Sequence, residues 1–458
     1  MRKIYEFTNK KRFSISMTLK TRRLLFYSLL LIFILAGTGA ILYSSGWRFN
    51  PGSFHLKKTG AIYIETEPKD ALIQIDNIYF KNRTGLIQKG TLIPNLPPEL
   101  YEIKLKKDGY FPYYKNLLIE SSMVNELINV ILIPQEIKKL PLDNSKKVKG
   151  NKFIALSKDG NKIILKDKET HYLYDLNNLS TALNVNAVFS TLSQLYALAP
   201  EIYSIVFHPF EPNKLIIEDE NGLQILDTNR LTLDTVINKK LMDSTNSPLT
   251  AWTVGNSSIY YAAGTSNQEL ETRNYTLFSY NLILKTEDIL NQEPLAIEKD
   301  AEIIKIKADN SGNRIAILDN FNDIYIFNLS NQKLNQIAHS AKTFSFSPDD
   351  KKIAFLDKDG KINIYFFEDW RQGVNKKTGD IIRLDLNNKT EIKEIIWYQD
   401  SSHIFVNYNS RLDFIEIDDR LPLNQYIIAD ESLPFFYDNK NDLIYFIQNN
   451  SLLISSLK

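Results

Sequence analysis

The chain has 458 residues, of which 43% are hydrophobic and 12% aromatic, a composition that favours a folded, strand-rich protein over disorder. Its 55 lysines and arginines nearly balance 54 aspartates and glutamates, so the net charge of +1 provides no field to gather nucleic acid. Cysteine is absent, which excludes disulfides, thiolate metal sites and thiol nucleophiles.

A long apolar run lies near the amino end. Residues 24–43, LLFYSLLLIFILAGTGAILY, carry no charge, and a helix of this length, at about 1.5 Å per residue, spans a bilayer core of about 30 Å. The tail before it, residues 1–23, has eight lysines and arginines against one acid, Glu6. The positive-inside rule therefore predicts a single-pass plasma-membrane protein with tail 1–23 in the cytoplasm and the bulk of the chain outside. Tyr43 and Trp47 are predicted to lie at the membrane interface.

A cleaved signal peptide is the competing interpretation of this run. The sequence GTGA before Ile41 offers a small-residue cleavage site, but the apolar region is long for a signal and continues past that site. An uncleaved anchor is therefore favoured, and a buried core helix is disfavoured because no polar face interrupts the run. Residues 44–58 follow as a short neck.

Residues 59–134 show the period-two alternation of β-strands. In GAIYIETEP, Ile62 and Ile64 alternate with Tyr63 and Glu65. The segment ALIQIDNIYF repeats the alternation around an Asp-Asn turn, GTLIPNLPPELYEIKLKKDGYFPYYKNLLIE gives two more strands, and NELINVILIP reads as a closing strand. The segment is therefore predicted to be a small β-domain.

This small β-domain resembles the PEGA domain, a small non-catalytic β-sandwich of bacterial and archaeal surface proteins that often lies next to a membrane segment. The resemblance rests on IYIETEPKDALIQIDN, on LPPELYEIKLKKDGY and on the spacing between them. The usual Pro-x-Gly-Ala turn appears here as Pro68-Lys69-Asp70-Ala71, and the usual LxPGxY as LPPELY, so the turn glycines are replaced. The resemblance implies a β-sandwich that acts as an accessory module.

The remaining chain repeats one pattern seven times: an apolar strand, a polar turn, a second apolar strand, another polar turn and a third strand. The second strands are predicted to begin at Ile163, Leu215, Ile259, Ile315, Ile353, Ile404 and Leu443. Their mean spacing of about 47 residues is the size of a four-stranded blade. Separate hairpins could not bury their faces, and a β-helix would need shorter rungs, so residues 135–458 are predicted to form a seven-bladed β-propeller.

The last repeat ends after its third strand, which leaves its blade without an outer strand. The segment QEIKKLPLD, residues 135–143, lies just before the first repeat and is predicted to supply that strand and close the ring. The full expectation is an all-β protein: one N-terminal transmembrane helix, a small PEGA-like β-sandwich and a seven-bladed β-propeller.

The repeat FSFSPDDKKIAFLDKDGKINIYFF, residues 344–367, is similar to WD-repeat-like and TolB-like propeller families, above all in SPDDKKIAF. The copies lack the Trp-Asp dipeptide and the Gly-His pair of intracellular WD repeats, so the extracytoplasmic TolB-like type resembles them more. The resemblance implies the fold and says little about function, because propellers serve both as enzymes and as binding platforms.

Acidic turns and histidines are the candidates for a metal or catalytic site. Asp357-Lys358-Asp359-Gly360 has the flavour of a calcium loop, but its glycine is misplaced for a helix–loop–helix site and a strand follows at once, so a hairpin turn is favoured. None of the histidines pairs at metal spacing, and there is no GxSxG, HExxH or phosphate loop. We therefore predict no catalytic residue, no metal site and no cofactor. The five histidines are His55, His171, His208, His339 and His403.

Three tryptophans lie in the predicted propeller. Trp252 and Trp397 fall inside first strands, where packing between blades is expected. Trp370 opens a polar excursion, DWRQGVNKKTGD, and Trp370, Arg371 and Gln372 have the composition of a partner-binding hot spot. The alternative is a tryptophan folded back over its own blade.

A binding or scaffold protein of the cell envelope is the leading functional hypothesis, with a protein, peptide or glycan held on the propeller. One rival is an envelope enzyme, of lyase or glycoside hydrolase type, with carboxylates in the propeller channel. A second rival is a purely structural surface spacer.

Overall fold

The computed structural model of the chain describes thirteen stretches of the sequence. They are residues 18–50, 55–84, 89–143, 146–193, 201–239, 249–267, 272–295, 297–298, 300–371, 373–386, 391–408, 411–431 and 433–457. Strands dominate them, as the sequence predicts, and the all-β fold with one N-terminal apolar helix is confirmed.

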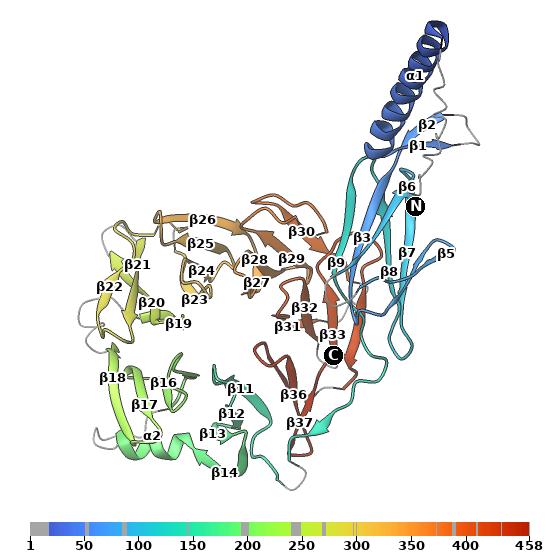
Figure 1. Cartoon of the computed structure of the whole chain (residues 1–458). Helices are drawn as coiled ribbons and strands as arrows, with labels where there is room; N and C mark the ends of the chain where they lie inside the picture. Colours follow the sequence, from blue (N-terminus) through green and yellow to red (C-terminus); the bar gives the residue numbers. More distant parts are fainter. Residues whose placement is uncertain are drawn as a thin grey trace, which may run out of the picture.

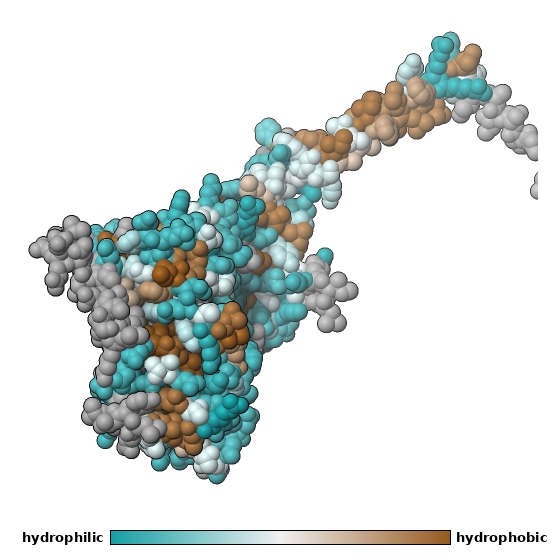
Figure 2. All heavy atoms as spheres, turned by 90° about the vertical axis from the view of Figure 1, so that its left-hand side faces the viewer, coloured by the Kyte–Doolittle hydropathy of each residue, from teal (hydrophilic) through white to brown (hydrophobic). Residues whose placement is uncertain are grey.

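The apolar run forms helix α1 (Leu19–Ser44), which begins at Thr18, whose hydroxyl accepts a hydrogen bond from the Thr21 backbone N–H. None of its residues is buried, and the helix projects as a mostly apolar rod away from the rest of the molecule (Figure 2). By length and composition α1 can cross a membrane, a test that a signal sequence near the start of a chain also passes.

A two-stranded hairpin connects α1 to the rest of the molecule. It consists of β1 (Trp47–Asn50) and β2 (His55–Lys58), which pair antiparallel as a sheet of their own. The sequence analysis predicted only a short neck here, because each strand has just four residues and shows no long alternation of apolar and polar residues.

The small β-domain has two sheets packed on one core. One sheet has the order β6-β3-β9 and the other β5-β4-β7-β8. Buried isoleucines and leucines from both sheets, such as Ile62, Ile73 and Ile103, form a single cluster between them. The strands are β3 (Gly60–Glu67), β4 (Leu72–Ile75), β5 (Ile78–Phe80), β6 (Thr91–Leu96), β7 (Leu100–Lys106), β8 (Tyr113–Leu118) and β9 (Val124–Ile131).

The middle of the small β-domain differs from the sequence prediction. Residues 90–120 form three strands rather than two, because β6 ends before the Pro97-Pro98 pair and joins β3 in the opposite sheet. Proline lacks the N–H that a ladder needs, so the pair separates β6 from β7.

Seven four-stranded antiparallel sheets follow and are arranged in a ring (Figure 1). Each second strand begins at, or one residue before, the position that the spacing of the repeats predicts. The seven-bladed propeller is therefore confirmed.

The first three blades comprise these strands: blade 1, β11 (Lys152–Leu156), β12 (Lys162–Asp167), β13 (Thr170–Asp175) and β14 (Asn178–Asn184); blade 2, β15 (Ser204–Phe207), β16 (Lys214–Asp219), β17 (Gly222–Asp227) and β18 (Thr232–Asn238); blade 3, β19 (Leu249–Val254), β20 (Ser258–Asn267), β21 (Thr272–Asn281) and β22 (Glu287–Ile289). The next three comprise these: blade 4, β23 (Ile303–Ala308), β24 (Arg314–Asp319), β25 (Ile324–Asn328) and β26 (Lys333–Ala338); blade 5, β27 (Ala341–Phe346), β28 (Lys352–Asp357), β29 (Ile362–Phe366) and β30 (Ile381–Leu384); blade 6, β31 (Ile392–Trp397), β32 (His403–Tyr408), β33 (Leu412–Glu416) and β34 (Gln425–Ala429).

Blade 7 combines strands from both ends of the propeller sequence. Its order is β10-β37-β36-β35, with β10 (Leu140–Pro141), β35 (Phe435–Asp438), β36 (Leu443–Gln448) and β37 (Ser451–Ser455). Leu140 lies opposite Ile454. The outer position is thus held by a strand from within residues 135–143.

The acidic turns of the propeller are explained by their hydrogen bonds. In blade 5 the Ser347 hydroxyl donates to Asp349 Oδ1 over 2.5 Å and accepts from the Lys352 backbone N–H over 3.0 Å. Blade 1 repeats both contacts with Ser157 and Asp159. These side chains satisfy the backbone where the first strand turns into the second.

In the part of the propeller that the structure describes, one helix interrupts the blades. Helix α2 (Val185–Ser193) follows β14 and buries Val185 and Phe189 in the cluster between blades 1 and 2. The sequence analysis did not predict this helix.

Candidate functional site

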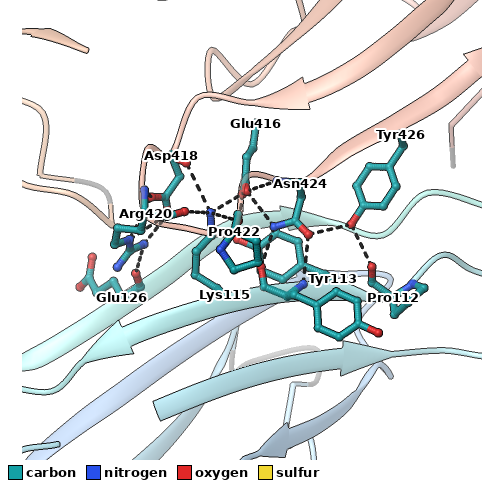
Figure 3. A network of polar contacts seen from close by, with 11 residues as sticks. Pro112, Tyr113, Lys115, Glu126, Glu416, Asp418, Arg420, Pro422, Asn424 and Tyr426 are labelled. Carbon is teal, nitrogen blue, oxygen red and sulfur yellow. Dashed lines mark hydrogen bonds and ion pairs between the residues drawn. The ribbon is translucent and has the colours of Figure 1, made fainter. Parts of the chain in front are cut away.

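A network of polar contacts joins the small β-domain to blade 6 (Figure 3). The loop between β33 and β34, residues 417–424, runs along the edge strand β8. The Asn116 N–H donates to the Leu421 carbonyl over 2.8 Å, and Asn424 exchanges two hydrogen bonds with the Tyr114 backbone, of 3.0 and 2.7 Å. The propeller thereby covers an edge that would otherwise be open to pairing with another chain.

A buried ion pair lies at the centre of the junction. Lys115 Nζ, on β8, is 2.6 Å from Glu416 Oε1, at the end of β33, and both side chains are almost wholly excluded from solvent. The ammonium also donates to the Arg420 carbonyl over 2.7 Å. Glu416 further accepts from Tyr113 Oη at 2.8 Å and from the Asn424 N–H at 2.8 Å. With its charges paired and its lone pairs used, the cluster can remain buried.

The electrostatics of the junction fix which group donates. Burial and the neighbouring Glu416 carboxylate raise the pKa of Tyr113 well above its usual value, so its hydroxyl stays protonated and donates. Burial also raises the pKa of Glu416, while the Lys115 ammonium opposes that rise.

A second charged contact joins the two domains nearby. Arg420 forms a two-pronged pair with Asp418, and its Nη2 donates to the Glu126 carbonyl of β9 over 3.0 Å. Burial alone would raise the pKa of Asp418, but the hydrogen bonds and charge of Arg420, together with Lys115, lower it overall. Arg420 thus connects blade 6 to the sheet β6-β3-β9 of the small β-domain, whereas Lys115 lies in the other sheet.

Apolar packing completes the junction. Ile131 and Ile133, at the end of the small β-domain, are buried in one cluster with residues of blades 6 and 7. Phe111 stacks on Tyr426 with ring centroids 5.9 Å apart. The two domains therefore share a core as well as a polar network, which makes them one mechanical unit.

The predicted hot-spot tryptophan is not exposed. Trp370 is 8% accessible, stacks on Phe366 with centroids 5.3 Å apart and belongs to the core between blades 5 and 6. The structure thus agrees with the alternative interpretation, in which Trp370 folds back over its own blade. Arg371 beside it has an 82% exposed side chain, and Gln372 lies outside the described residues.

The loop that Trp370 opens contacts the junction rather than solvent alone. Lys376 pairs with Asp419 at 2.7 Å. Gly373 has φ +85° and lies so close to Arg420 that an added Cβ would be 3.1 Å from its guanidinium nitrogen. The loop that was predicted to bind a partner therefore makes contacts within the chain.

Two pockets share Gln399 and Asp400: one lies between blades 5 and 6 of the propeller, and the other between the small β-domain and the propeller. The larger has a volume of about 660 Å³ and is lined by Pro348, Asp349, Lys351, Asp369, Trp370, Arg371, Gln399, Asp400 and Ser401. The other, of about 410 Å³, is lined by Glu65, Thr66, Glu67, Lys69, Lys89, Asn129, Val130, Ile131, Tyr398, Gln399 and Asp400. Both signs of charge are present, as suits a polar partner such as a peptide or glycan.

The propeller channel is lined by the first strands of the blades. A pocket of about 370 Å³ there contains Trp252, whose Nε1 donates to Glu218 over 2.7 Å. Trp252 is only half-buried, whereas Trp397 packs between blades as predicted.

Glu394, on the first strand of blade 6, is a carboxylate with two lysines near it. Burial raises the pKa of Glu394 on β31, but the charges that interact with it most are Lys307 and Lys305 rather than a second carboxylate. Burial lowers the pKa of both lysines. In the described residues, Glu394 thus has lysines rather than a carboxylate as its strongest charged neighbours.

Two of the remaining chemical candidates, Asp357 and His208, belong to turns. Asp357 Oδ1 accepts the N–H groups of Asp359 and Lys361, so DKDG is a hairpin turn. His208 Nδ1 accepts two backbone N–H groups, from Phe210 and Glu211, in the turn of blade 2. Among the described residues no group of three or more His, Asp or Glu could hold a metal ion.

The two predicted interface residues flank the end of α1. The Arg48 guanidinium lies 3.8 Å from the centre of the Tyr43 ring, and Lys58 Nζ lies 5.6 Å from that of Trp47. Both aromatic rings thus carry a cation beside them.

Sequence reasoning missed Lys115 and Glu416, although a signal was present. In YYKNLL, Lys115 shares the inward face with Tyr113 and Leu117, and a lysine at a buried strand position needs a partner. The sequence could not show that this partner lies 301 positions further along the chain.

A comparison with protein families supports the propeller. The family model "NUP159/214 beta propeller" matches residues 234–449, from β18 to the end of β36. Among solved structures, the β-propeller domain of Cps50 (Swd1) from Myceliophteria thermophila matches with 10% identity and a TM-score of 0.46, over 70% of this chain and 100% of that one. A comparison with the curated proteins finds no match.

Proposed function

We propose that the chain is a membrane-anchored, extracytoplasmic scaffold or binding protein without enzymatic activity, which presents a propeller to a protein, peptide or glycan at the cell envelope. In this proposal α1 is an uncleaved anchor, residues 59–134 form a PEGA-like accessory domain, and residues 135–458 form a TolB-like propeller. The basic tail 1–23 lies in the cytoplasm.

The observation that carries the proposal is the buried junction. A flexible linker would let the propeller turn freely, whereas the Lys115–Glu416 pair and the shared apolar core hold it at one angle to the small β-domain. Fixing orientation is useful to a protein that must offer one face of the propeller to a partner at a set distance from the membrane.

The pocket beside Arg371 is the proposed partner site. It lies next to the fixed junction, and Arg371 and Lys351 bring exposed cations to its wall while Asp369 and Asp400 bring acids. Arginine is well suited to this role because its planar group can bind carboxylates and sugars through several hydrogen bonds at once.

The test is crosslinking of the full chain in its own membranes, followed by identification of the crosslinked partners. A partner should be recovered with the wild type and with Arg230→Glu, a matched exposed arginine on blade 2, and lost with Arg371→Glu. Equal recovery from both variants would place the partner elsewhere. Recovery of no partner with any variant would overturn the binding role in favour of a structural spacer.

Membrane topology is tested separately by adding protease to intact cells. The proposal expects removal of the propeller while a tag on the basic tail stays protected. Full protection of the propeller would contradict the orientation.

A further inference from the structure

The β1–β2 hairpin has one mainly apolar face, with a lysine at its end, and one basic face. Trp47 pairs with Lys58 and Phe49 with Leu56, and in an antiparallel pair opposed residues share a face. Trp47, Phe49, Leu56 and Lys58 therefore share one face, and Phe49 and Leu56 are 58% and 47% exposed. The opposite face carries the pair Arg48–Lys57.

Among the described residues no third strand pairs with the hairpin. It forms a sheet by itself rather than extending either sheet of the small β-domain. An isolated hairpin is marginally stable in water at best. A surface that covers its apolar face would supply the missing stabilisation.

The hairpin is held at the end of α1. Gly46, with φ +82°, turns the chain out of the helix, and its carbonyl accepts the Thr59 N–H over 2.9 Å. Arg48 donates to the Tyr43 carbonyl over 2.7 Å. Figure 1 shows the two strands where α1 meets the small β-domain. If α1 spans a bilayer, the hairpin starts at the level of the headgroups.

We propose that the β1–β2 hairpin is an interfacial anchor that binds anionic lipid. Trp47, Phe49 and Leu56 enter the boundary between headgroups and acyl chains. Lys58, which shares their face, binds a lipid phosphate, and Lys57, on the opposite face, adds positive charge near the headgroups. Continuity with α1 and the complementary charge select a lipid surface as the occupant. This inference rests on the membrane anchoring in the proposed function.

The absence of cysteine makes a direct depth measurement possible, since each introduced thiol is unique. The full chain is reconstituted in vesicles that contain one third phosphatidylglycerol, and a nitroxide is attached to Leu56→Cys. Its accessibility to oxygen and to a water-soluble nickel chelate reports its depth. Ile34→Cys in α1 serves as the hydrocarbon reference, and Tyr79→Cys, on exposed strand β5, as the aqueous reference.

The two references separate the possible failures. The inference expects the Leu56 label at interfacial depth, between the references. A Leu56 label as aqueous as the Tyr79 label, with the Ile34 label in hydrocarbon, overturns the hairpin anchor and leaves the proposed function intact. An aqueous Ile34 label overturns both.

The lipid class is tested with charge reversal. In the same vesicles, spin-labelled phosphatidylglycerol should show a motionally restricted fraction with the wild type that drops by at least half in the Lys57→Glu/Lys58→Glu variant. Lys342→Glu, an exposed lysine on β27, is the matched control and should leave that fraction unchanged. Equal restriction of labelled phosphatidylcholine and phosphatidylglycerol would overturn the preference for anionic lipid.

Discussion

Two lysine–carboxylate ion pairs of this protein differ in how far their side chains are exposed to solvent. Lys115–Glu416 joins two domains out of contact with water, whereas Lys361–Asp385 bridges strands of blade 5 with side chains 35% and 85% exposed. In the buried pair, the loss of one partner leaves a charge without solvation. In the exposed pair, water replaces the lost partner. The same residue types are thus structural in one place and nearly dispensable in the other.

The largest expected effect is that of Lys115→Met. It leaves Glu416 buried without its cation and should lower the free energy of unfolding by about 3–5 kcal/mol. Urea unfolding of the full chain, followed by circular dichroism, measures the change. Lys115→Met/Glu416→Met removes both charges and should recover most of the loss, and a double variant as unstable as the single one would mean that the pair itself is stabilising.

Trp370→Ala comes next in expected size. Removal of a buried indole from the core between blades 5 and 6 should cost about 3–5 kcal/mol, because a cavity remains against Phe366. The neighbouring Arg371→Ala, at an exposed position, should leave the urea midpoint unchanged. A midpoint shift of similar size in both variants would show that the loop, rather than the indole, matters.

A pH-dependent effect of intermediate size is expected at His208. Burial lowers the pKa of its imidazole below the usual value, and Nδ1 must be unprotonated to accept from Phe210 and Glu211. Because the folded-state pKa is depressed, this stability is complete above about pH 6.5, the unfolded value, and is lost as the pH falls through the folded value.

The matched variant His208→Asp places in blade 2 the acid that blade 4 has at the same position, Asp309, directly after its first strand. The urea concentration at the unfolding midpoint of the wild type should decrease when the pH is lowered from 7.5 to 5.5. The midpoint of the variant should decrease less. Identical pH profiles would contradict a role for His208 titration.

Lys361→Met should have the smallest effect, since its pair with Asp385 is exposed. Its urea midpoint should match the wild type, and the wild-type midpoint should change little when salt is raised to screen surface charges. A loss comparable with that of Lys115→Met would remove the distinction between the two pairs.

The propeller was predictable because its signal is local and repeated. Alternating strands and turn residues recur seven times, and the turns of Asp159 and Asp349 are closed by contacts within a few positions. The hairpin β1–β2 and helix α2 escaped prediction because each is short and occurs once.

The junction could not be predicted because its partners are remote in the chain. The environment of Trp370 was likewise not predictable from the sequence. Its composition predicted a partner-binding hot spot, but the fold packs the indole on Phe366 and the loop against the chain's own blade 6.

The sequence by itself determined the order of the modules, the number of blades and the apolar helix, because periodicity and hydrophobicity are written in neighbouring residues. Only the tertiary structure decided that Lys115 meets Glu416, that β8 is covered by residues 417–424, and that two pockets open beside them. Those contacts join positions about 300 apart in the chain, and no local pattern specifies which distant side chain will neutralise a buried charge.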